Sequence, residues 1–191
     1  MKRILVIEDD QKHIKDAEVT IANNPEVSAD FAKTFNEATK LMKENEYDGI
    51  ISDIFFPCHN EKECSSSITG WNKIISSKCY ALLISFGIGF GGYEEYIQAA
   101  YRWLKGKSMH PTGVIVAKMA IESELPIILV TDTYHHGYKT EPVNQWARKN
   151  RITLIDSEPD DRYNGSDSQK NWESAIEILL TKIHYAKQKQ E

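Results

Sequence analysis

The sequence predicts an α/β protein built on a parallel sheet, and two observations carry this prediction. Short apolar runs alternate with segments whose apolar residues recur at helical spacing, almost from end to end. The apolar runs are continuous, as in KRILVIEDD at the N-terminus, which is typical of strands buried on both faces of a sheet. The 191 residues, of which 41% are hydrophobic and 27% charged, fit one soluble domain of ordinary size.

The first part of the chain indicates the order strand, helix, strand, helix, strand. The opening strand is followed by a predicted helix over residues 11–23 and a short strand, VSADFA. Thr34 and Glu37 form a capping box, T-x-x-E, which predicts the start of the second helix. The third strand, YDGIISD, ends on Asp53, a carboxylate in an otherwise apolar run. Such a group is costly to bury unless it is paired, bound to a metal or placed at a strand end.

The C-terminal part continues the same alternation. Its first predicted helix, over residues 113–125, begins with GVIVA, which also fits a strand. The later predicted elements are a strand at PIILVT, a helix at EPVNQWARKN, a strand at RITLID and a helix at WESAIEILLTKIHY, before a solvated tail, AKQKQE. These lengths favour a parallel sheet with helices on both faces.

Residues 58–111 break the alternation. They contain all three cysteines, a serine-rich turn, the run GIGFGG and a helix-like stretch, YEEYIQAAYRWLKG. We interpret them as an insertion within a single domain of residues 1–191, because the segment is short for a core of its own. An alternative register starts the third helix at Gly70 and places the excess length later in the chain.

Composition and charge exclude several classes of protein. The net charge of -5 gives no electrostatic reason to bind nucleic acid. No apolar run is long enough to span a bilayer, and the N-terminal run is too short and too acidic for a signal peptide. An odd number of cysteines without an export signal favours reduced thiols. We therefore expect a cytoplasmic protein that acts neither on nucleic acid nor in a membrane.

Acidic residues follow two of the predicted strands. Glu8 and Asp9 end the first strand and Asp53 ends the third, while Thr131 ends the fourth. In a flavodoxin-like, doubly wound sheet of strand order 2-1-3-4-5, the first and third strands are neighbours and ligands bind at their carboxyl ends. The three carboxylates would then repel one another, and a hard divalent cation such as Mg²⁺ would relieve the repulsion. The simpler interpretation is that the acids only solvate strand ends.

The stretches ILVIEDD, YDGIISDIFFP and PIILVT resemble those of the receiver domains of two-component response regulators. The resemblance implies that Asp53 accepts a phosphoryl group and that Thr131 hydrogen-bonds this group. It also implies a Mg²⁺ ion held by Glu8, Asp9, Asp53 and the backbone carbonyl of Phe55.

The resemblance covers roughly residues 1–57 and 112–185. It implies a stand-alone receiver-like signalling protein of a phosphorelay, without an output domain, which acts by binding a protein partner such as a sensor kinase or a downstream effector. The alternative, from another class, is a metal- or nucleotide-dependent enzyme of flavodoxin-like fold that uses the acidic edge or the Gly87–Gly92 loop.

The pattern departs from the family after the fifth strand. Receivers carry a lysine there, usually followed by proline, whereas Glu158 precedes Pro159 in this chain, so an anion replaces the cation, or Ser157 does if the register slips by one. Ile155 occupies the position of an aromatic switch residue. Candidate replacements for the missing cation are Lys107, Lys118 and Lys139. Without that cation, a pseudo-receiver that is not phosphorylated is as good an interpretation as a phosphorylated switch.

Two further patterns have both a functional and a structural interpretation. Gly87, Gly89 and Gly92 match the dinucleotide motif G-x-G-x-x-G, although the next apolar run leads into Lys118 and not into an acid. A flexible loop before a helix is the simpler interpretation. The aromatic stripe of residues 93–104 either packs back on the domain or forms a homodimer or partner surface.

Histidines and cysteines offer further metal ligands. His135 and His136 follow the fourth strand, where they either add imidazole ligands for a transition metal or decorate a loop. Cys58, Cys64 and Cys79 lack the paired spacing of zinc sites, so idle thiols compete with a metal or redox role.

Overall fold

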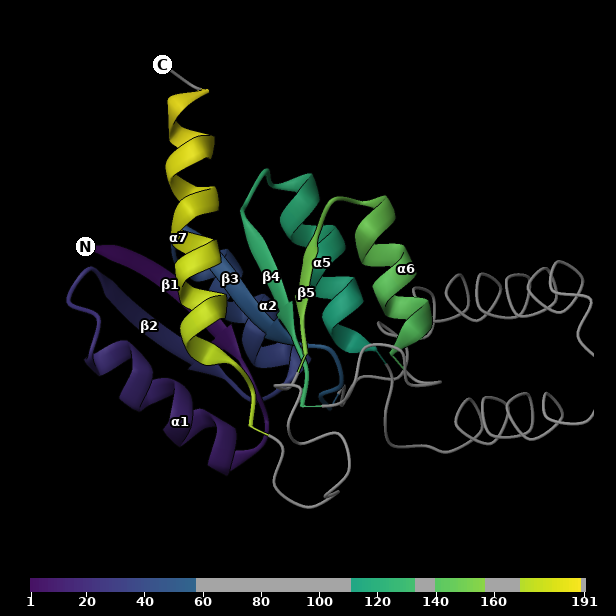
Figure 1. Ribbon diagram of the computed structural model, residues 1–191, viewed down its shortest axis with the longest axis horizontal. Coiled ribbons are helices and arrows are strands. Elements are labelled where there is room, and N and C mark those ends of the chain that lie inside the picture. The colour runs from purple at the N-terminus through teal and green to yellow at the C-terminus, as the bar shows by residue number, and fades with distance from the viewer. Residues whose placement is uncertain (58–110, 133–139, 157–168, 190–191) are drawn as a thin grey trace, which may run out of the picture.

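The computed structural model describes residues 1–57, 111–132, 140–156 and 169–189, and these form a five-stranded parallel sheet (Figure 1). The strand order is β2-β1-β3-β4-β5, so the predicted flavodoxin-like α/β fold and its order are confirmed. The strands are β1 (Lys2–Ile7), β2 (Val27–Ala32), β3 (Gly49–Asp53), β4 (Ile127–Val130) and β5 (Thr153–Ile155).

Several predictions from the sequence fall outside the described residues. They concern the insertion up to residue 110, with its three cysteines, its glycine loop and its aromatic stripe. They also concern Lys107, His135, His136, Lys139, Glu158 and Pro159.

The helices cover both faces of the sheet. They are α1 (Gln11–Ala22), α2 (Phe35–Glu44), α5 (Thr112–Glu122), α6 (Glu141–Lys149) and α7 (Trp172–Gln188). Helices α1 and α7 lie on one face, and α2, α5 and α6 lie on the other (Figure 1). Each face has its own apolar core, which explains why the strands are apolar on both sides. Within the described residues, no helix is both long enough and apolar enough to cross a membrane.

The helix ends follow from local chemistry. The Thr34 side chain accepts a hydrogen bond from the Glu37 N–H at 3.2 Å, so α2 begins where the capping box predicts. The Glu37 carboxylate accepts from the N–H of Lys33 at 2.7 Å, one residue before the cap. The tail that starts at Ala186 is exposed from Lys187 to Lys189, as predicted, but it is helical to Gln188 and not frayed from its start. Ala, Lys and Gln are all good helix formers, which accounts for this continuation.

Strand β3 lies at the centre of the sheet and is buried along its whole length. Its register sets the geometry of the carboxyl edge. Ser52 pairs with Ile7 of β1, and Asp53 pairs with Val130 of β4. Glu8 follows Ile7 and therefore lies at the level of Asp53, whereas Thr131 follows Val130 and lies one residue further along the edge.

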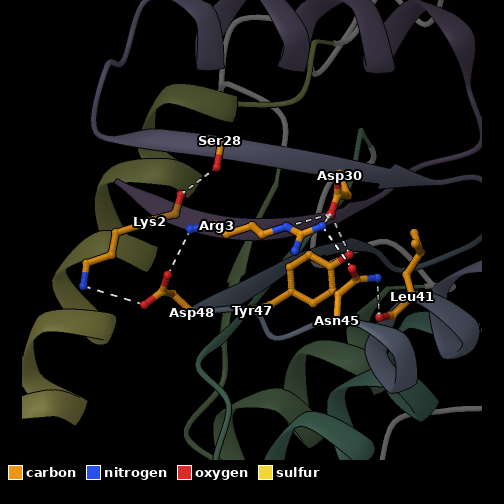
Figure 2. A network of polar contacts seen from close by, with 8 residues as sticks. All are labelled: Lys2, Arg3, Ser28, Asp30, Leu41, Asn45, Tyr47 and Asp48. Carbon is orange, nitrogen blue, oxygen red and sulfur yellow. Dashed lines mark hydrogen bonds and ion pairs between the residues drawn. The ribbon is translucent and has the colours of Figure 1, made fainter.

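The amino edge of the sheet carries an exposed polar network centred on Arg3 (Figure 2). The Arg3 guanidinium donates to Asp30 Oδ2 at 2.6 and 3.0 Å and to Asn45 Oδ1 at 3.1 Å. It also lies 5.2 Å from the centre of the Tyr47 ring, whose hydroxyl donates to the same Asp30 oxygen at 2.8 Å. The Arg3 backbone N–H donates to Asp48 Oδ2 at 2.9 Å. These contacts join β1, β2, the end of α2 and the approach to β3.

We expect Arg3→Met to lower the free energy of unfolding by about 1 kcal/mol, because an exposed ion pair contributes little but this guanidinium serves three partners. Chemical denaturation at low salt measures the change. Arg148→Met, at an exposed position of α6, is the matched control and should change stability by less than about 0.5 kcal/mol. Equal effects of the two changes would show that the network adds nothing.

Candidate functional site

The carboxyl edge of the sheet brings the predicted acidic residues together. Glu8, Asp9 and Asp53 each present a carboxylate oxygen, and these oxygens lie within 4.8 Å of one another. Glu8 and Asp53 are buried, with 1% and 5% of their surface exposed, whereas Asp9 is exposed. The proximity predicted from strand order is thus present in the structure. The other predicted site residue at this edge, Thr131, is buried at the end of β4.

A lysine that the sequence reasoning missed lies between the two buried carboxylates. The Lys170 ammonium donates to Glu8 Oε2 and lies 2.9 Å from Asp53 Oδ1. Only 2% of the Lys170 side chain is exposed. Lys170 comes after β5, just before the N-cap of α7, so the structure corrects the inference that an anion replaces the cation. Of the lysines considered earlier, Lys118 is in the described part of the chain, midway along α5, and Lys170 pairs with Asp53 instead.

Every oxygen of the two buried carboxylates has a hydrogen-bond or ion-pair partner. Glu8 Oε1 accepts from the backbone N–H of Asp10 at 3.2 Å, and Asp53 Oδ2 accepts from the backbone N–H of Phe55 at 3.1 Å. The remaining oxygens, Glu8 Oε2 and Asp53 Oδ1, share the Lys170 ammonium. The cluster is therefore held by backbone on its outer side and by one ammonium on its inner side.

Burial governs the protonation of this cluster. Burial, reinforced by the charge of Asp53, raises the pKa of Glu8 to about 7. Burial also raises the pKa of Asp53, although the Lys170 ammonium opposes this change. For Lys170, burial alone would lower the pKa, but the carboxylates of Asp53 and Glu8 outweigh it and raise the pKa to about 12. Lys170 is therefore a permanent cation near neutral pH, and it favours the ionised form of Asp53.

The segment after Asp53 is fixed by the first turn of α5. The Gly113 N–H donates to the Ile54 carbonyl at 3.0 Å, and the Thr112 hydroxyl donates to the Phe56 carbonyl at 2.8 Å. Gly113 packs so closely that a Cβ atom there would lie 2.1 Å from the Asp53 carbonyl oxygen. The helix thus supports the backbone that carries Asp53 and the Phe55 carbonyl.

A second pair borders the site. His13 lies in the first turn of α1, and its Nε2 atom is 3.8 Å from Oδ2 of Asp132. Asp132 is the residue that follows Thr131 in the chain. Pairing with Asp132 raises the pKa of His13 and lowers the pKa of Asp132. His13 is buried, and its Nδ1 has no hydrogen-bond partner among the described residues. Sequence reasoning missed His13, because a single histidine in an amphipathic helix is not distinctive.

No protein-family model, no curated protein and no solved structure matches this chain. The site therefore has to be interpreted from its own chemistry.

The donor set fits a hard divalent cation. Three carboxylates each offer an oxygen within 4.8 Å of the others, close enough to bind one ion together. Carboxylate oxygens are the ligands that Mg²⁺ prefers, and exposed Asp9 leaves one side of the cluster open to water. The same arrangement presents the Asp53 carboxyl group beside the Lys170 ammonium, which suits transfer of an anionic group.

We expect Gly113→Ala to destabilise the protein by about 2–3 kcal/mol, because the added methyl group overlaps the Asp53 carbonyl. In an unhindered helix the same change stabilises by about 0.5–1 kcal/mol, so the sign alone is informative. Thermal and chemical unfolding measure it. A more stable variant would contradict the close packing of α5 on β3.

Stability should fall as the pH rises from about 4.5 to about 7 in the absence of divalent cations. The folded protein holds the Glu8 proton up to about pH 7, whereas the unfolded chain releases it near the ordinary value of 4.5. The stabilisation from the protonated Glu8 is therefore complete below about pH 4.5 and is lost as the pH rises through about 7. Unfolding in buffers with a chelator measures this dependence. Glu8→Gln should give a shallower curve, and parallel curves for the two proteins would refute the assignment.

Proposed function

We propose that this protein is a receiver-like signalling protein in which Asp53 accepts a phosphoryl group. The observation that carries the proposal is the convergence, at one sheet edge, of Asp53 with Glu8, Asp9 and the buried ammonium of Lys170. A nucleophilic carboxylate, an acidic pair and a nearby ammonium are the groups that phosphoryl transfer to a carboxylate uses.

A Mg²⁺ ion would be held by Glu8, Asp9, Asp53 and the Phe55 carbonyl, and when bound it neutralises the oxygens of the phosphoryl group. Before an ion binds, the Lys170 ammonium favours the carboxylate form of Asp53 over its protonated form. Backbone contacts from Phe55 and α5 fix the direction of the Asp53 carboxylate.

The transfer step is a displacement at phosphorus. An Asp53 oxygen forms a bond to phosphorus while the bond between phosphorus and the donor's leaving group breaks, and that group departs with the electron pair. Thr131, at the end of the neighbouring strand, would hydrogen-bond the transferred group. The donor is a small phosphoryl compound or a phosphorylated side chain of a partner such as a sensor kinase. A change at Asp53 would then alter binding to that partner or to a downstream effector.

We expect incubation with acetyl phosphate and Mg²⁺ to add the mass of one phosphoryl group to the intact protein. Asp53→Asn should abolish the adduct, because an amide is not a nucleophile for this step. Asp48→Asn, which removes a carboxylate at the opposite edge of the sheet, is the matched control and should retain it.

Intact-mass spectrometry measures these adducts directly. An adduct that persists in Asp53→Asn would place the reaction elsewhere, and wild-type protein without any adduct would refute acceptance from this donor.

A further inference from the structure

Lys170 occupies the inner side of the acidic cluster, which a cation bound by Glu8 and Asp53 also needs. The outer oxygens of both carboxylates are held by backbone N–H groups, as described above. The two inner oxygens already share the Lys170 ammonium. A divalent cation at these oxygens would face a positive charge inside a buried site, where screening by water is weak. The ammonium and the cation therefore compete for the same place.

A hollow beside Lys170 offers the ammonium another position. It has a volume of about 370 Å³ and lies between α1 and the start of α7, which occupy the same face of the sheet (Figure 1). Lys170 and Asp16 both line it. Asp16 Oδ2 is buried and has no hydrogen-bond partner among the described residues. An ammonium in the hollow would supply the partner that this oxygen lacks.

We propose that Lys170 and a divalent cation exclude each other at Glu8 and Asp53, and that the displaced ammonium moves into the hollow beside Asp16. This inference rests on the metal site of the proposed function and not on phosphoryl transfer. It gives Lys170 two positions, one in the acidic cluster without the cation and one against α1 with it.

The exchange of Lys170 for a cation would affect the start of α7. The Lys170 carbonyl accepts from the Trp172 N–H at 2.9 Å, and the side chain of the next residue, Asn171, caps the helix by accepting from the Ser174 N–H at 3.0 Å. Trp172 is 3% exposed and lines the same hollow. Movement of the Lys170 side chain would thus change the surroundings of Trp172, and the cation would be coupled to the groove between α1 and α7.

Calorimetric titration with Mg²⁺ tests the exclusion. Lys170→Met should bind Mg²⁺ about tenfold more tightly than wild type or better, because the competing charge is gone. Lys149→Met makes the same change of residue and charge at an exposed position at the end of α6, and it should bind like wild type. Glu8→Gln should weaken binding in both backgrounds, which assigns the signal to this cluster.

Affinity in Lys170→Met that is equal to or weaker than wild type would overturn the exclusion, and so would the absence of binding in both proteins. If Lys170→Met folds only with the cation, its thermal midpoint should rise more steeply with Mg²⁺ concentration than that of wild type. A slope no steeper than wild type would count against the exclusion in the same way.

Tryptophan fluorescence tests the second position. Mg²⁺ should change the emission of wild type, and Trp172→Phe should remove this change although three other tryptophans remain. Asp16→Asn should weaken Mg²⁺ binding about threefold, since the displaced ammonium loses its new partner. Glu18→Gln, an exposed position on the same helix, is the matched control and should not. Unchanged affinity in Asp16→Asn would overturn the role of the hollow.

These titrations contain no phosphoryl donor, so their outcome is independent of whether Asp53 accepts a phosphoryl group. A protein that binds Mg²⁺ as described but forms no adduct would keep this inference and lose the proposed function. An adduct at Asp53 together with equal Mg²⁺ affinity in wild type and Lys170→Met would keep the proposed function and overturn this inference.

Discussion

The ion pair that Lys170 makes with Glu8 and Asp53 is the interaction on which the carboxyl edge of the sheet depends. Two carboxylates buried side by side lose their hydration and repel each other, and each effect is costly. One ammonium offsets both carboxylates and ties together the end of β1, the end of β3 and the approach to α7. Two neighbouring strands can end in buried acids at one point only because a cation lies between them.

Most of the fold could be predicted because it follows from rules that act over short distances. The continuous apolar run of β3 indicated burial on both faces, and the Thr34 cap located the start of α2. The approach of Glu8 to Asp53 needed only the strand order, because neighbouring parallel strands in register end at the same edge. Capping is local, and the strand order follows from the alternation of strands and helices, so the sequence carried enough information for both.

Lys170 could not be found in this way, because its place is set by where α7 begins and not by its spacing from β5. Residues 157–169 separate Lys170 from Asp156, and a motif with fixed spacing points to Glu158 instead. Charge balance would have been the better guide. Buried acids need a cation. The connection from β5 to α7 starts at the acidic edge, and its sequence contains two basic residues, Arg162 and Lys170.

The two edges of the sheet place similar charges in different surroundings, and this difference decides which edge can act as a switch. At the amino edge, the side chains of Arg3 and Asp30 are 47% and 35% exposed, so water and salt screen their attraction. At the carboxyl edge, the Lys170 side chain is 2% exposed, and any added charge acts through a poorly screened interior. A cation or a phosphoryl group at Asp53 would upset the charge balance there, and on our proposal the balance would be restored by movement of the Lys170 ammonium. Lys170 is the buried cation in contact with both carboxylates, and it stands at the start of α7. On the proposed exchange, a change of charge at Asp53 would therefore be converted into a change at the surface that α7 shares with α1.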